Sequence, residues 1–221
     1  MSQINRIDGG LIDQEKVLNF TFNGQILKGC EGDTLASALL ANNKHLIGRS
    51  FKYHRPRGIV TAGSEEPNAI MEIGNGAYKD PNTRATVTQL YNGLEANSQN
   101  HRGPLSFDFM AITDFLSPLL GAGFYYKTFM WPKSFWEKFY EPAIRKSAGL
   151  GTLSTEADPD TYDKGFRHCD ILIIGSGATG LSAALTAAES GAKIILADED
   201  FLMGGRLNSE TNEIDGIAGS E

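Results

Sequence analysis

The feature that most constrains this chain is a long stretch without charge near its C-terminal end. From Ile171 to Ala188, eighteen consecutive residues carry no charged side chain. A run of that length is close to what a helix needs to cross a membrane. Three glycines and several hydroxyl residues interrupt it, however, and these make a poor lipid-spanning helix. The stretch therefore needs another structural explanation.

The sequence "DILIIGSGATG" places a short apolar strand directly before a G-x-G-x-x-G motif that runs from Gly175 to Gly180. The pattern predicts a helix at "LSAALTAAES", ended by Gly191, and then a second apolar strand, "KIILA", which leads into Asp198. Asp198 lies eighteen residues beyond Gly180, close to the spacing of about twenty for an acid that binds a ribose hydroxyl. The motif in this context predicts the start of an α/β Rossmann-type dinucleotide-binding domain.

Each motif residue has a physical role in this interpretation. Gly175 lets the chain turn sharply out of the strand, Gly177 leaves room for a pyrophosphate, and Gly180 lets the helix lie close to the sheet. The free N–H groups and positive dipole end of the helix stabilise phosphate charge. Asp198 would accept a hydrogen bond from the adenosine 2'-hydroxyl and repel a 2'-phosphate, which favours NAD or FAD over NADP. Glu199 is the alternative acid, because a shift of one residue in the strand end would exchange the two.

The predicted site therefore binds a cofactor and contains no catalytic residue. The glycine pair before Arg206 either approaches the dinucleotide a second time or forms a simple tight loop. The candidate cofactor-binding residues are Gly175, Ser176, Gly177, Ala178, Thr179, Gly180, Asp198, Glu199, Gly205 and Arg206.

Only one strand, helix and strand of the nucleotide-binding fold precede Glu221, and even a mononucleotide-binding half needs more strands. We therefore expect the domain to be incomplete. Either the chain is a fragment of a longer polypeptide, which we favour, or another chain completes the sheet.

The first hundred residues predict a small α+β unit. "VLNFTFNGQILK", 17–28, predicts a β-hairpin around Asn23 and Gly24. Asp33 is expected to cap a following helix that ends at Asn42 and Asn43. A loop should precede a strand at 69–74, and the alternation in "ATVTQLY", 85–91, predicts one more strand.

Aromatic residues are concentrated in the next part of the chain. Twelve of the twenty-one fall between Phe107 and Tyr140. Such a density needs to be covered, either by packing between two domains of this polypeptide, which is the more ordinary interpretation, or by another subunit. The polar, proline-containing stretch 154–165 predicts a linker.

Composition excludes several classes of protein. The formal charge of -7 and pI near 5.2 disfavour a general nucleic-acid binder. Cys30 and Cys169 lie in no C-x-x-C or His/Cys cluster, so we expect two buried thiols and no metal site. The N-terminal residues do not form a signal peptide. We expect a cytoplasmic protein without a membrane segment.

Three stretches together resemble one family. They are "GDTLASALLANNKHLIGRSFKYHRPRGIVTAGSEEPNA", 32–69, "FYYKTFMWPKSFWEKFYEPAIRKSAGLG", 124–151, and the fingerprint at 175–198. The chain closely resembles the N-terminal part of the alpha subunit of heterotetrameric sarcosine oxidase. The resemblance implies a β-grasp domain related to [2Fe-2S] ferredoxins over 1–100, an aromatic-rich connection over 101–166, and a truncated dinucleotide-binding domain over 167–221.

The resemblance to ferredoxins can be tested on the residues. A plant-type cluster needs four cysteine thiolates, three of them in the loop after the helix. That loop, 43–63, contains no cysteine, so we expect the β-grasp domain to hold no cluster.

The loop instead carries four basic residues, Arg49, Lys52, Arg55 and Arg57. They either contact a cofactor phosphate or an acidic partner, or they are held by ion pairs to Glu65, Glu66 or other acids. We assign His54, in the same loop, no catalytic role.

The resemblance implies an oxidoreductase that acts on the CH-NH group of donors and demethylates sarcosine to glycine, formaldehyde and hydrogen peroxide. It implies NAD on this chain, FAD and FMN elsewhere in the complex, and beta, gamma and delta subunits as partners. By itself this chain should be inactive. Two alternatives remain at this stage: a subunit of a related flavin-dependent amine or opine dehydrogenase, and a non-catalytic dinucleotide-binding scaffold.

Overall fold

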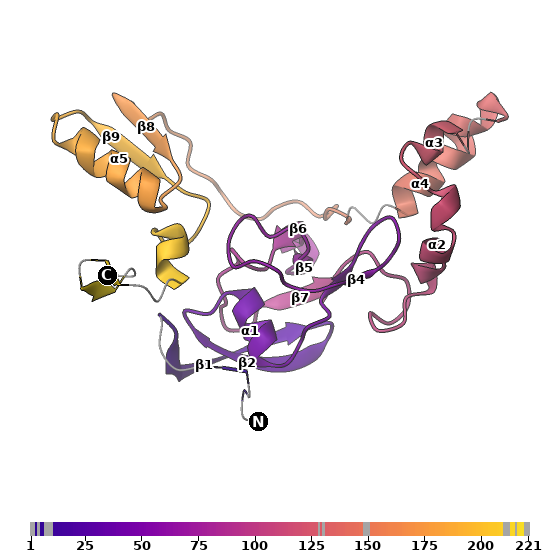
Figure 1. Cartoon of the computed structure of the whole chain (residues 1–221), viewed down its shortest axis with the longest axis horizontal. Helices are drawn as coiled ribbons and strands as arrows, with labels where there is room; N and C mark the ends of the chain where they lie inside the picture. The colour runs from indigo at the N-terminus through magenta and orange to yellow at the C-terminus, as the bar shows by residue number, and fades with distance from the viewer. Residues whose placement is uncertain are drawn as a thin grey trace.

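The computed structural model describes residues 3, 5, 6, 11–127, 129, 131–147, 151–209, 213, 214 and 216–218. The outer ends of the first and last expected domains, at 1, 2 and 219–221, lie outside the described residues. Figure 1 shows a central sheet with a helical part at one end of the molecule and a separate strand-helix-strand part at the other.

The predicted hairpin is confirmed. Strands β1 (Asp13–Phe22) and β2 (Gln25–Glu31) pair antiparallel, with Phe22 opposite Gln25. The two turn residues, Asn23 and Gly24, have φ angles of 50° and 75°. Positive φ at both central positions is what a two-residue hairpin turn requires, and Asn-Gly adopts it at low cost.

Helix α1 (Leu35–Ala41) also forms as expected and ends at Asn42, but its cap is not Asp33. The hydroxyl of Thr34 accepts the N–H of Ser37, and the hydroxyl of Ser37 accepts the N–H of Thr34, which makes a capping box. The buried Asp33 carboxylate instead accepts the backbone N–H of Cys30 at 2.8 Å and pairs with Arg6. The prediction was wrong by one residue because both side chains suit an N-cap.

The central sheet has five strands in the order β2-β1-β7-β5-β6. Its last three strands are β5 (Ile70–Ile73), β6 (Asp80–Arg84) and β7 (Glu95–Ser98), and β7 lies parallel to β1. The core between this sheet and α1 consists of fully buried side chains. They include Phe20, Leu35, Leu39, Ile47, Met71 and Leu94.

The strand predicted at 85–91 is wrong. Its alternation reflects burial of Ala85 and Leu90, but its backbone serves the start of α1 instead of a sheet. The carbonyls of Ala85 and Thr88 accept the N–H groups of Ala36 and Leu35, at 2.9 and 2.8 Å. Periodicity reports which side chains are buried and cannot tell a strand from an extended segment that satisfies a helix end.

The loop after α1 contains one short pair of strands that the sequence did not indicate, β3 (Gly48–Arg49) and β4 (Pro56–Arg57). Its second half folds around the buried carboxylate of Glu66. One oxygen accepts the N–H groups of Val60 and Thr61, and the other accepts those of Asn68 and Ala69. A single acid thereby satisfies four main-chain donors in a segment that lacks regular structure.

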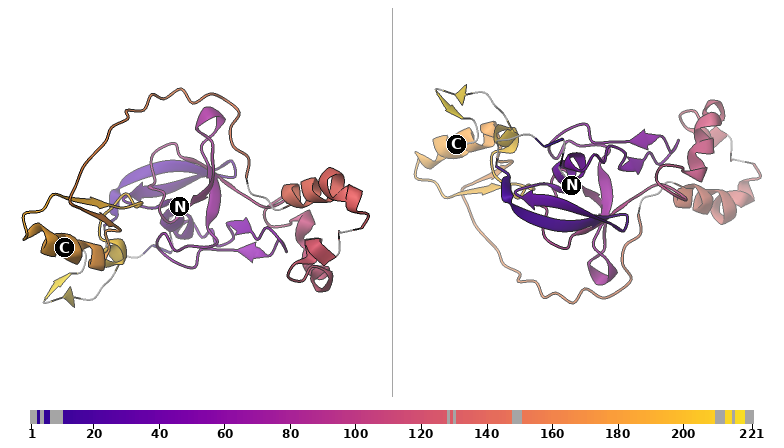
Figure 2. Two further views of the ribbon diagram at one scale, coloured as in Figure 1. Left: turned by 90° about the horizontal axis from the view of Figure 1, so that it is seen from above. Right: turned by 90° about the horizontal axis from the view of Figure 1, so that it is seen from below.

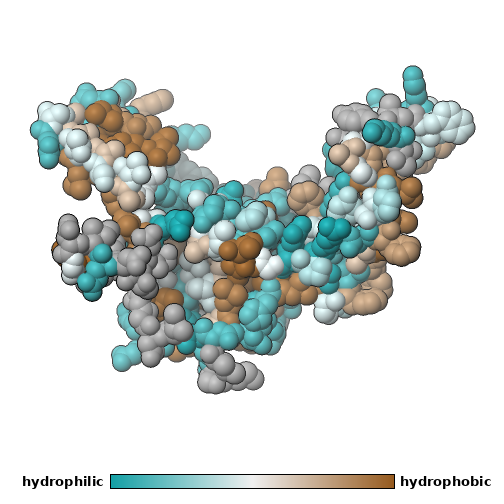
Figure 3. Space-filling view, in the orientation of Figure 1, coloured by the Kyte–Doolittle hydropathy of each residue, from teal (hydrophilic) through white to brown (hydrophobic). Residues whose placement is uncertain are grey.

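The segment from 101 to 147 forms short helices. They are η2 (Phe109–Ala111), α2 (Ile112–Phe115), η3 (Ser117–Leu119), α3 (Phe124–Lys127), η4 (Lys133–Phe135), the π-helix η5 (Trp136–Tyr140) and α4 (Glu141–Ser147). Several aromatic side chains here are exposed, among them Phe115 at 87% and Trp131 at 84%. Brown patches on this part in Figure 3 show the same apolar surface. In Figure 1 this part lies at the end of the molecule opposite α5. Whether another domain of the polypeptide or another subunit covers its aromatic side chains stays a prediction.

The predicted linker is extended, and both views in Figure 2 show it passing along the outside of the central sheet. Beyond it come β8 (Ile171–Ile174), α5 (Ala178–Ala188) and β9 (Ile194–Ala197). The 3-10 helix η6 (Gly205–Ser209) and the antiparallel pair β10 (Glu213–Ile214) and β11 (Ile217–Ala218) follow. One further 3-10 helix, η1 (Gly76–Tyr78), joins β5 to β6. In the described part of the chain, no helix is long and apolar enough to cross a bilayer.

We expect Glu66→Gln to lower the free energy of unfolding of the part with the five-stranded sheet, residues 11–100, by about 2–4 kcal/mol. The new amide group faces two N–H donors, which then lose their acceptor. Urea denaturation at pH 7 measures the loss. Glu65→Gln is the matched control: its side chain is exposed, so the cost should stay below about 0.5 kcal/mol.

The same pair of proteins gives a pH test. Burial raises the pKa of Glu66, but the hydrogen bonds from Thr61, Val60 and Asn68 outweigh it and hold the pKa below its usual value. The stabilisation is therefore fully present above the unfolded-state pKa of about 4.3 and is lost as the pH falls through the lower folded-state value. A gap between wild type and Glu66→Gln that stayed constant from pH 7 to pH 3 would contradict this role.

Candidate functional site

The glycine-rich turn joins β8 to α5 as the sequence predicts. Strands β8 and β9 pair in parallel, with Ile174 opposite Ala197, so the ends of both strands meet at one edge. Gly175 has φ 99°, a left-handed value that favours glycine. Gly177 is the N-cap of α5 and no side chain caps the helix there. The first N–H groups of α5 therefore have no capping side chain, which leaves donors and a positive dipole end available to an anion.

Two glycines of the turn differ in what surrounds them. A Cβ built at Gly177 would meet no atom within 4 Å, whereas a Cβ at Gly180 would overlap the carbonyl oxygen of Gly175. Gly180 is thus required for the helix to lie against the turn. Gly177 is not required by packing, so its bare backbone leaves space for a ligand, as the pyrophosphate interpretation expects.

Asp198 follows β9 directly and reaches back to the turn. Its Oδ2 accepts the N–H of Ser176, and its Oδ1 accepts the N–H of Asp200 at 2.8 Å. These bonds, first that from Asp200 and then that from Ser176, hold the pKa of Asp198 below its usual value. Glu199 is exposed and makes no such contact with the turn. The structure therefore places Asp198, and not its alternative, beside the motif.

The second glycine pair also packs on the turn. The N–H of Gly204 donates to the carbonyl of Ser176 at 3.0 Å. A Cβ built at Gly205 would lie 3.2 Å from Cα of Gly177, and Gly205 has φ 54°. Gly205 is glycine because of this close approach, and Gly204 because its φ of 115° is left-handed. Arg206 follows and lines the same cleft as Gly177.

A cleft of about 510 Å³ opens beside the turn. Of the predicted site residues, Gly177, Asp198, Gly205 and Arg206 line it. Ala178, Thr179 and Glu199 do not line it, and all three are exposed. Residues of the part with the central sheet also line this cleft, and the sequence did not indicate them because they are distant in the chain and belong to no motif. These lining residues include Thr34, Ser37, Gly63, Ser64 and Glu65.

The loop 43–63 does not fit an iron–sulfur cluster. A [2Fe-2S] cluster needs four thiolate ligands, and the whole chain has two cysteines. Cys30 is buried on β2, and Cys169 is half-buried just before β8, so the expectation of two buried thiols is right only for the first. Among the described residues, no group of three His, Cys, Asp or Glu side chains is arranged to hold a metal ion.

The loop is organised instead by a buried polar network. The Arg49 guanidinium, 8% exposed as a residue, donates to the carbonyls of Leu105, Ser106 and His54 at 2.8–3.1 Å. Nδ1 of His54 lies 2.6 Å from Oδ2 of the buried Asp108. Burial raises the pKa of Asp108, but bonds from the N–H groups of Arg102 and Met110 and from His54 hold it below its usual value. Arg49 is thus a structural residue and is not available to a cofactor phosphate.

Two of the remaining basic residues, Lys52 and Arg55, contact the helical part, whereas Arg57 is exposed on β4. Arg55 pairs with Asp114 at 2.7 Å, which confirms the ion-pair interpretation for this residue. The ammonium of Lys52 lies 4.8 Å from the ring centre of Tyr53 and 5.1 Å from that of Phe124. Such contacts contribute about 0.5–1 kcal/mol at exposed sites. In the described part of the chain, neither Glu65 nor Glu66 forms an ion pair with these basic residues; Glu66 instead accepts main-chain N–H groups of the loop.

The comparisons identify relatives over most of the chain. Residues 15–101 match the family "2Fe-2S iron-sulfur cluster binding domain", and residues 170–217 match the family "FAD dependent oxidoreductase". The chain is 61% identical over 212 residues to sarcosine oxidase subunit alpha of Rhizobium meliloti (strain 1021), an alignment that covers 96% of this chain and 22% of the relative. It is 34% identical to the same subunit of Corynebacterium sp. (strain U-96), over 95% of this chain and 17% of the relative.

The chain therefore spans about a fifth of the length of these curated relatives. Among solved structures, L-proline dehydrogenase from P. horikoshii aligns with a TM-score of 0.47 and 17% identity, over 94% of this chain and 30% of that chain. The predicted resemblance to sarcosine oxidase alpha subunits is confirmed. So is the predicted order of a ferredoxin-like domain followed by the start of an oxidoreductase domain.

We expect Gly180→Ala to destabilise the β8–α5 turn by about 1–3 kcal/mol, because the added methyl group must displace the Gly175 carbonyl. Hydrogen exchange of the α5 amides measures this. Gly177→Ala is the control. Its added Cβ meets no atom, so exchange in α5 should match that of the wild type. Equal protection in the two variants would show that Gly180 does not pack as described.

Proposed function

We propose that this chain forms the N-terminal part of a sarcosine oxidase alpha subunit, to which it is similar over nearly all its length. Its first domain would be a ferredoxin-like domain without a cluster, and its last residues would form part of a Rossmann-type dinucleotide site. The chain would work in a complex that oxidatively demethylates sarcosine to glycine, formaldehyde and hydrogen peroxide. FAD and FMN would lie elsewhere in the complex, beside beta, gamma and delta subunits. The cytoplasmic location inferred from the sequence is part of the same proposal.

One observation supports the dinucleotide site above the others. The carboxylate that follows β9 is bonded to the main chain of the glycine-rich turn that follows β8. A diphosphate held by the N–H groups of the turn and α5 would therefore place its attached ribose next to a carboxylate. Gly177 also offers bare backbone to the cleft, since a Cβ built there would meet no atom within 4 Å.

The chain's own residues would bind and orient the cofactor. The turn would hold the diphosphate, Asp198 would accept the ribose hydroxyl, and Arg206 would supply a positive charge at the edge of the cleft. NAD and FAD share the ADP half that these residues would contact. We propose NAD for this chain, and we keep FAD as the second candidate because the matching family is described by that cofactor.

The alternatives predict different properties. A related amine or opine dehydrogenase subunit would be expected to carry cluster thiolates in loop 43–63, and this loop has none. A scaffold that binds a dinucleotide only structurally would retain the nucleotide site but would not alter turnover. Two measurements separate these three functions. One is the sarcosine oxidation rate of the complete subunit with and without its partner subunits, and the other is equilibrium dialysis of the complete subunit against NAD and FAD.

In the complete subunit, we expect Gly177→Ala to weaken dinucleotide binding by at least about tenfold, because the methyl group occupies the space where the diphosphate meets the backbone. The α5 amides should keep normal hydrogen exchange in this variant. Unchanged affinity for both NAD and FAD, measured by equilibrium dialysis, would rule out this turn as the binding site.

Asp198→Asn tests how the site discriminates between NAD and NADP. The carboxylate is charged at neutral pH, since its pKa is held low, and it should repel the 2'-phosphate of NADP. The variant keeps one acceptor oxygen for the turn but loses the charge. We expect the preference for NAD over NADP to fall by about tenfold, while Glu199→Gln, the neighbouring control, should leave it unchanged.

A further inference from the structure

An apolar cavity of about 410 Å³ lies between the loop 43–63 and the short helices of the segment 101–147. Small-molecule sites have volumes of about 300–1,000 Å³, so this cavity has room for one small ligand. Residues of the loop form one wall, and η2, α3, η5 and α4 contribute to the others. None of its described lining residues lines the cleft beside the glycine-rich turn, so the cavity is separate from the proposed dinucleotide site.

Aromatic side chains form much of its wall. Phe51, Phe124, Phe129 and Tyr140 all line the cavity. The ring centre of Phe129 lies 5.8 Å from that of Phe124, edge to face, and 5.4 Å from that of Tyr140. A flat ring packs well against such faces and edges. No Asp or Glu side chain is among the described lining residues, so the wall offers no carboxylate partner to a cationic ligand.

Most polar groups of the lining already have partners. The hydroxyls of Thr113 and Tyr140 each donate to a main-chain carbonyl, at 2.8 and 3.0 Å. The ammonium of Lys52 lies 5.1 Å from the ring centre of Phe124. His54 is the remaining polar side chain of the described lining, so a polar group of a ligand has to meet it.

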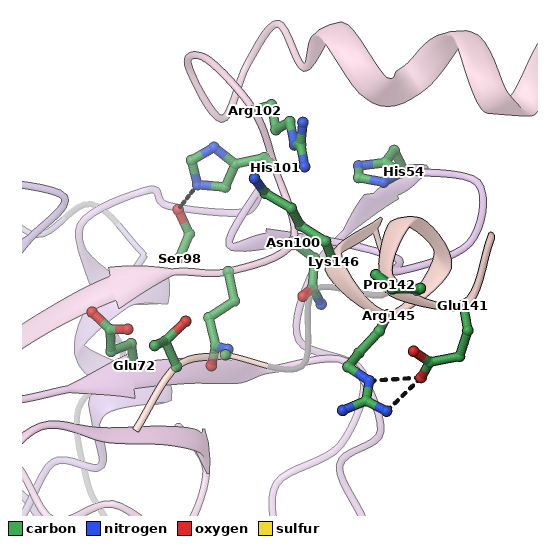
Figure 4. Close-up of a pocket in the computed structure, with 13 residues that line it drawn as sticks. His54, Glu72, Ser98, Asn100, His101, Arg102, Glu141, Pro142, Arg145 and Lys146 are labelled. Atoms are coloured by element: carbon green, nitrogen blue, oxygen red, sulfur yellow. Dashed lines mark hydrogen bonds and ion pairs between the residues drawn. The ribbon is translucent and has the colours of Figure 1, made fainter. Parts of the chain in front are cut away.

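One ring nitrogen of His54 is free. The residue is only 4% exposed, and its Nδ1 lies 2.6 Å from Oδ2 of Asp108. Nε2 has no hydrogen-bond partner in the described part of the chain, and it is not sealed off from solvent. Figure 4 shows His54 beside the first turn of α4, at the border of a larger polar cavity of about 710 Å³. Since buried polar groups normally have partners, Nε2 suits a group that a ligand supplies.

The contact with Asp108 decides which ligand group suits Nε2. A carboxylate only accepts hydrogen bonds, so Nδ1 carries a proton whether the ring is neutral or charged. Nε2 then accepts in the neutral ring and donates in the charged one, and a hydroxyl group can meet either need. A ligand carboxylate would instead leave water for an apolar cavity, which is costly. From the aromatic wall and this single free nitrogen, we propose that the cavity binds a small neutral phenol, whose ring packs on the aromatic side chains and whose hydroxyl meets Nε2 of His54.

Fluorine NMR titration of the complete subunit at pH 7 tests this with 4-fluorophenol and fluorobenzene, which differ only in the hydroxyl group. Both are neutral at this pH, since a phenol has a pKa of about 10. The phenol should bind about fivefold more tightly, as expected for one hydrogen bond. It should also bind more tightly than 4-fluorobenzoate, whose charge must be desolvated.

His54→Asn isolates the free nitrogen. Asparagine tolerates the left-handed φ of 54° at this position. Its amide can still donate to Asp108 in place of Nδ1, but it has no atom in place of Nε2. In this variant 4-fluorophenol should bind no better than fluorobenzene, whose affinity should stay that of the wild type. His45→Asn is the matched control and should keep the full preference for the phenol, because His45 lies in the same loop, is exposed and does not line the cavity.

Ala143→Leu tests the place of binding, and it does so even if His54→Asn does not fold. Ala143 lines the apolar cavity and not the polar one. The larger side chain should therefore weaken the binding of both 4-fluorophenol and fluorobenzene by about tenfold. Ala157→Leu, in the extended linker, is the control and should change neither affinity. Circular dichroism confirms that each variant is folded.

The phenol group could come from a free phenol or from a tyrosine side chain, and competition against 4-fluorophenol separates these sources. Displacement at lower concentrations of 4-methylphenol than of N-acetyltyrosinamide would identify a free phenol, and the reverse order a tyrosine side chain. Absence of saturable 4-fluorophenol binding, an undiminished preference for it in His54→Asn, unchanged affinities in Ala143→Leu, or tighter binding of 4-fluorobenzoate would overturn the assignment.

Discussion

Carboxylates that accept main-chain N–H groups hold the irregular parts of this molecule in place. Asp33 accepts the N–H of Cys30 at the start of α1, and Glu66 accepts four N–H groups in the loop that leads to β5. Asp108 accepts those of Arg102 and Met110, and Asp198 accepts those of Ser176 and Asp200. Charged acceptors make stronger bonds than neutral ones. In a chain with few long helices, these carboxylates therefore hold the loops in place. Some of the acidic residues behind the negative net charge thus have a structural role.

The most informative of these acids is Asp108, because it acts where the ferredoxin-like fold would otherwise depend on a metal. In a [2Fe-2S] protein, iron–thiolate bonds organise the loop after the helix. Here Arg49 binds three carbonyls of that loop and of the segment 105–106, while His54 and Asp108 lock the two segments together. Guanidinium and imidazole groups replace the cluster as the organising centre. The loop therefore has a network of side chains in the place where the matching family is named for a cluster, and it offers no cysteine ligand for one.

Sequence reasoning succeeded where the local pattern has one physical solution. Asn23-Gly24 requires a tight hairpin turn, and a strand followed by G-x-G-x-x-G and an acid requires a parallel β-α-β unit. It failed at 85–91, where burial of Ala85 and Leu90 imitated a strand whose hydrogen bonds in fact go to α1. It also could not show that Ser64 and Glu65 line the cleft, since contacts between residues more than a hundred positions apart leave no local signal. Of the candidate site, the turn glycines and Asp198 were predictable, and the second wall was not.

The two ends of the molecule differ in how completely they bury their apolar side chains. The ferredoxin-like part has its own core, with Leu35, Leu39 and Met71 fully buried. In the β8–α5–β9 part, Leu172 and Ile174 remain 56% and 81% exposed. Parallel sheets are normally covered on both faces, and two strands alone are marginally stable in water. The first part therefore has a core of its own, whereas the two strands that hold the glycine-rich turn leave apolar side chains exposed. The dinucleotide affinity proposed for the turn should depend on how firmly these strands are held as much as on its own glycines, because a diphosphate is bound tightly only by N–H groups that are already held in position.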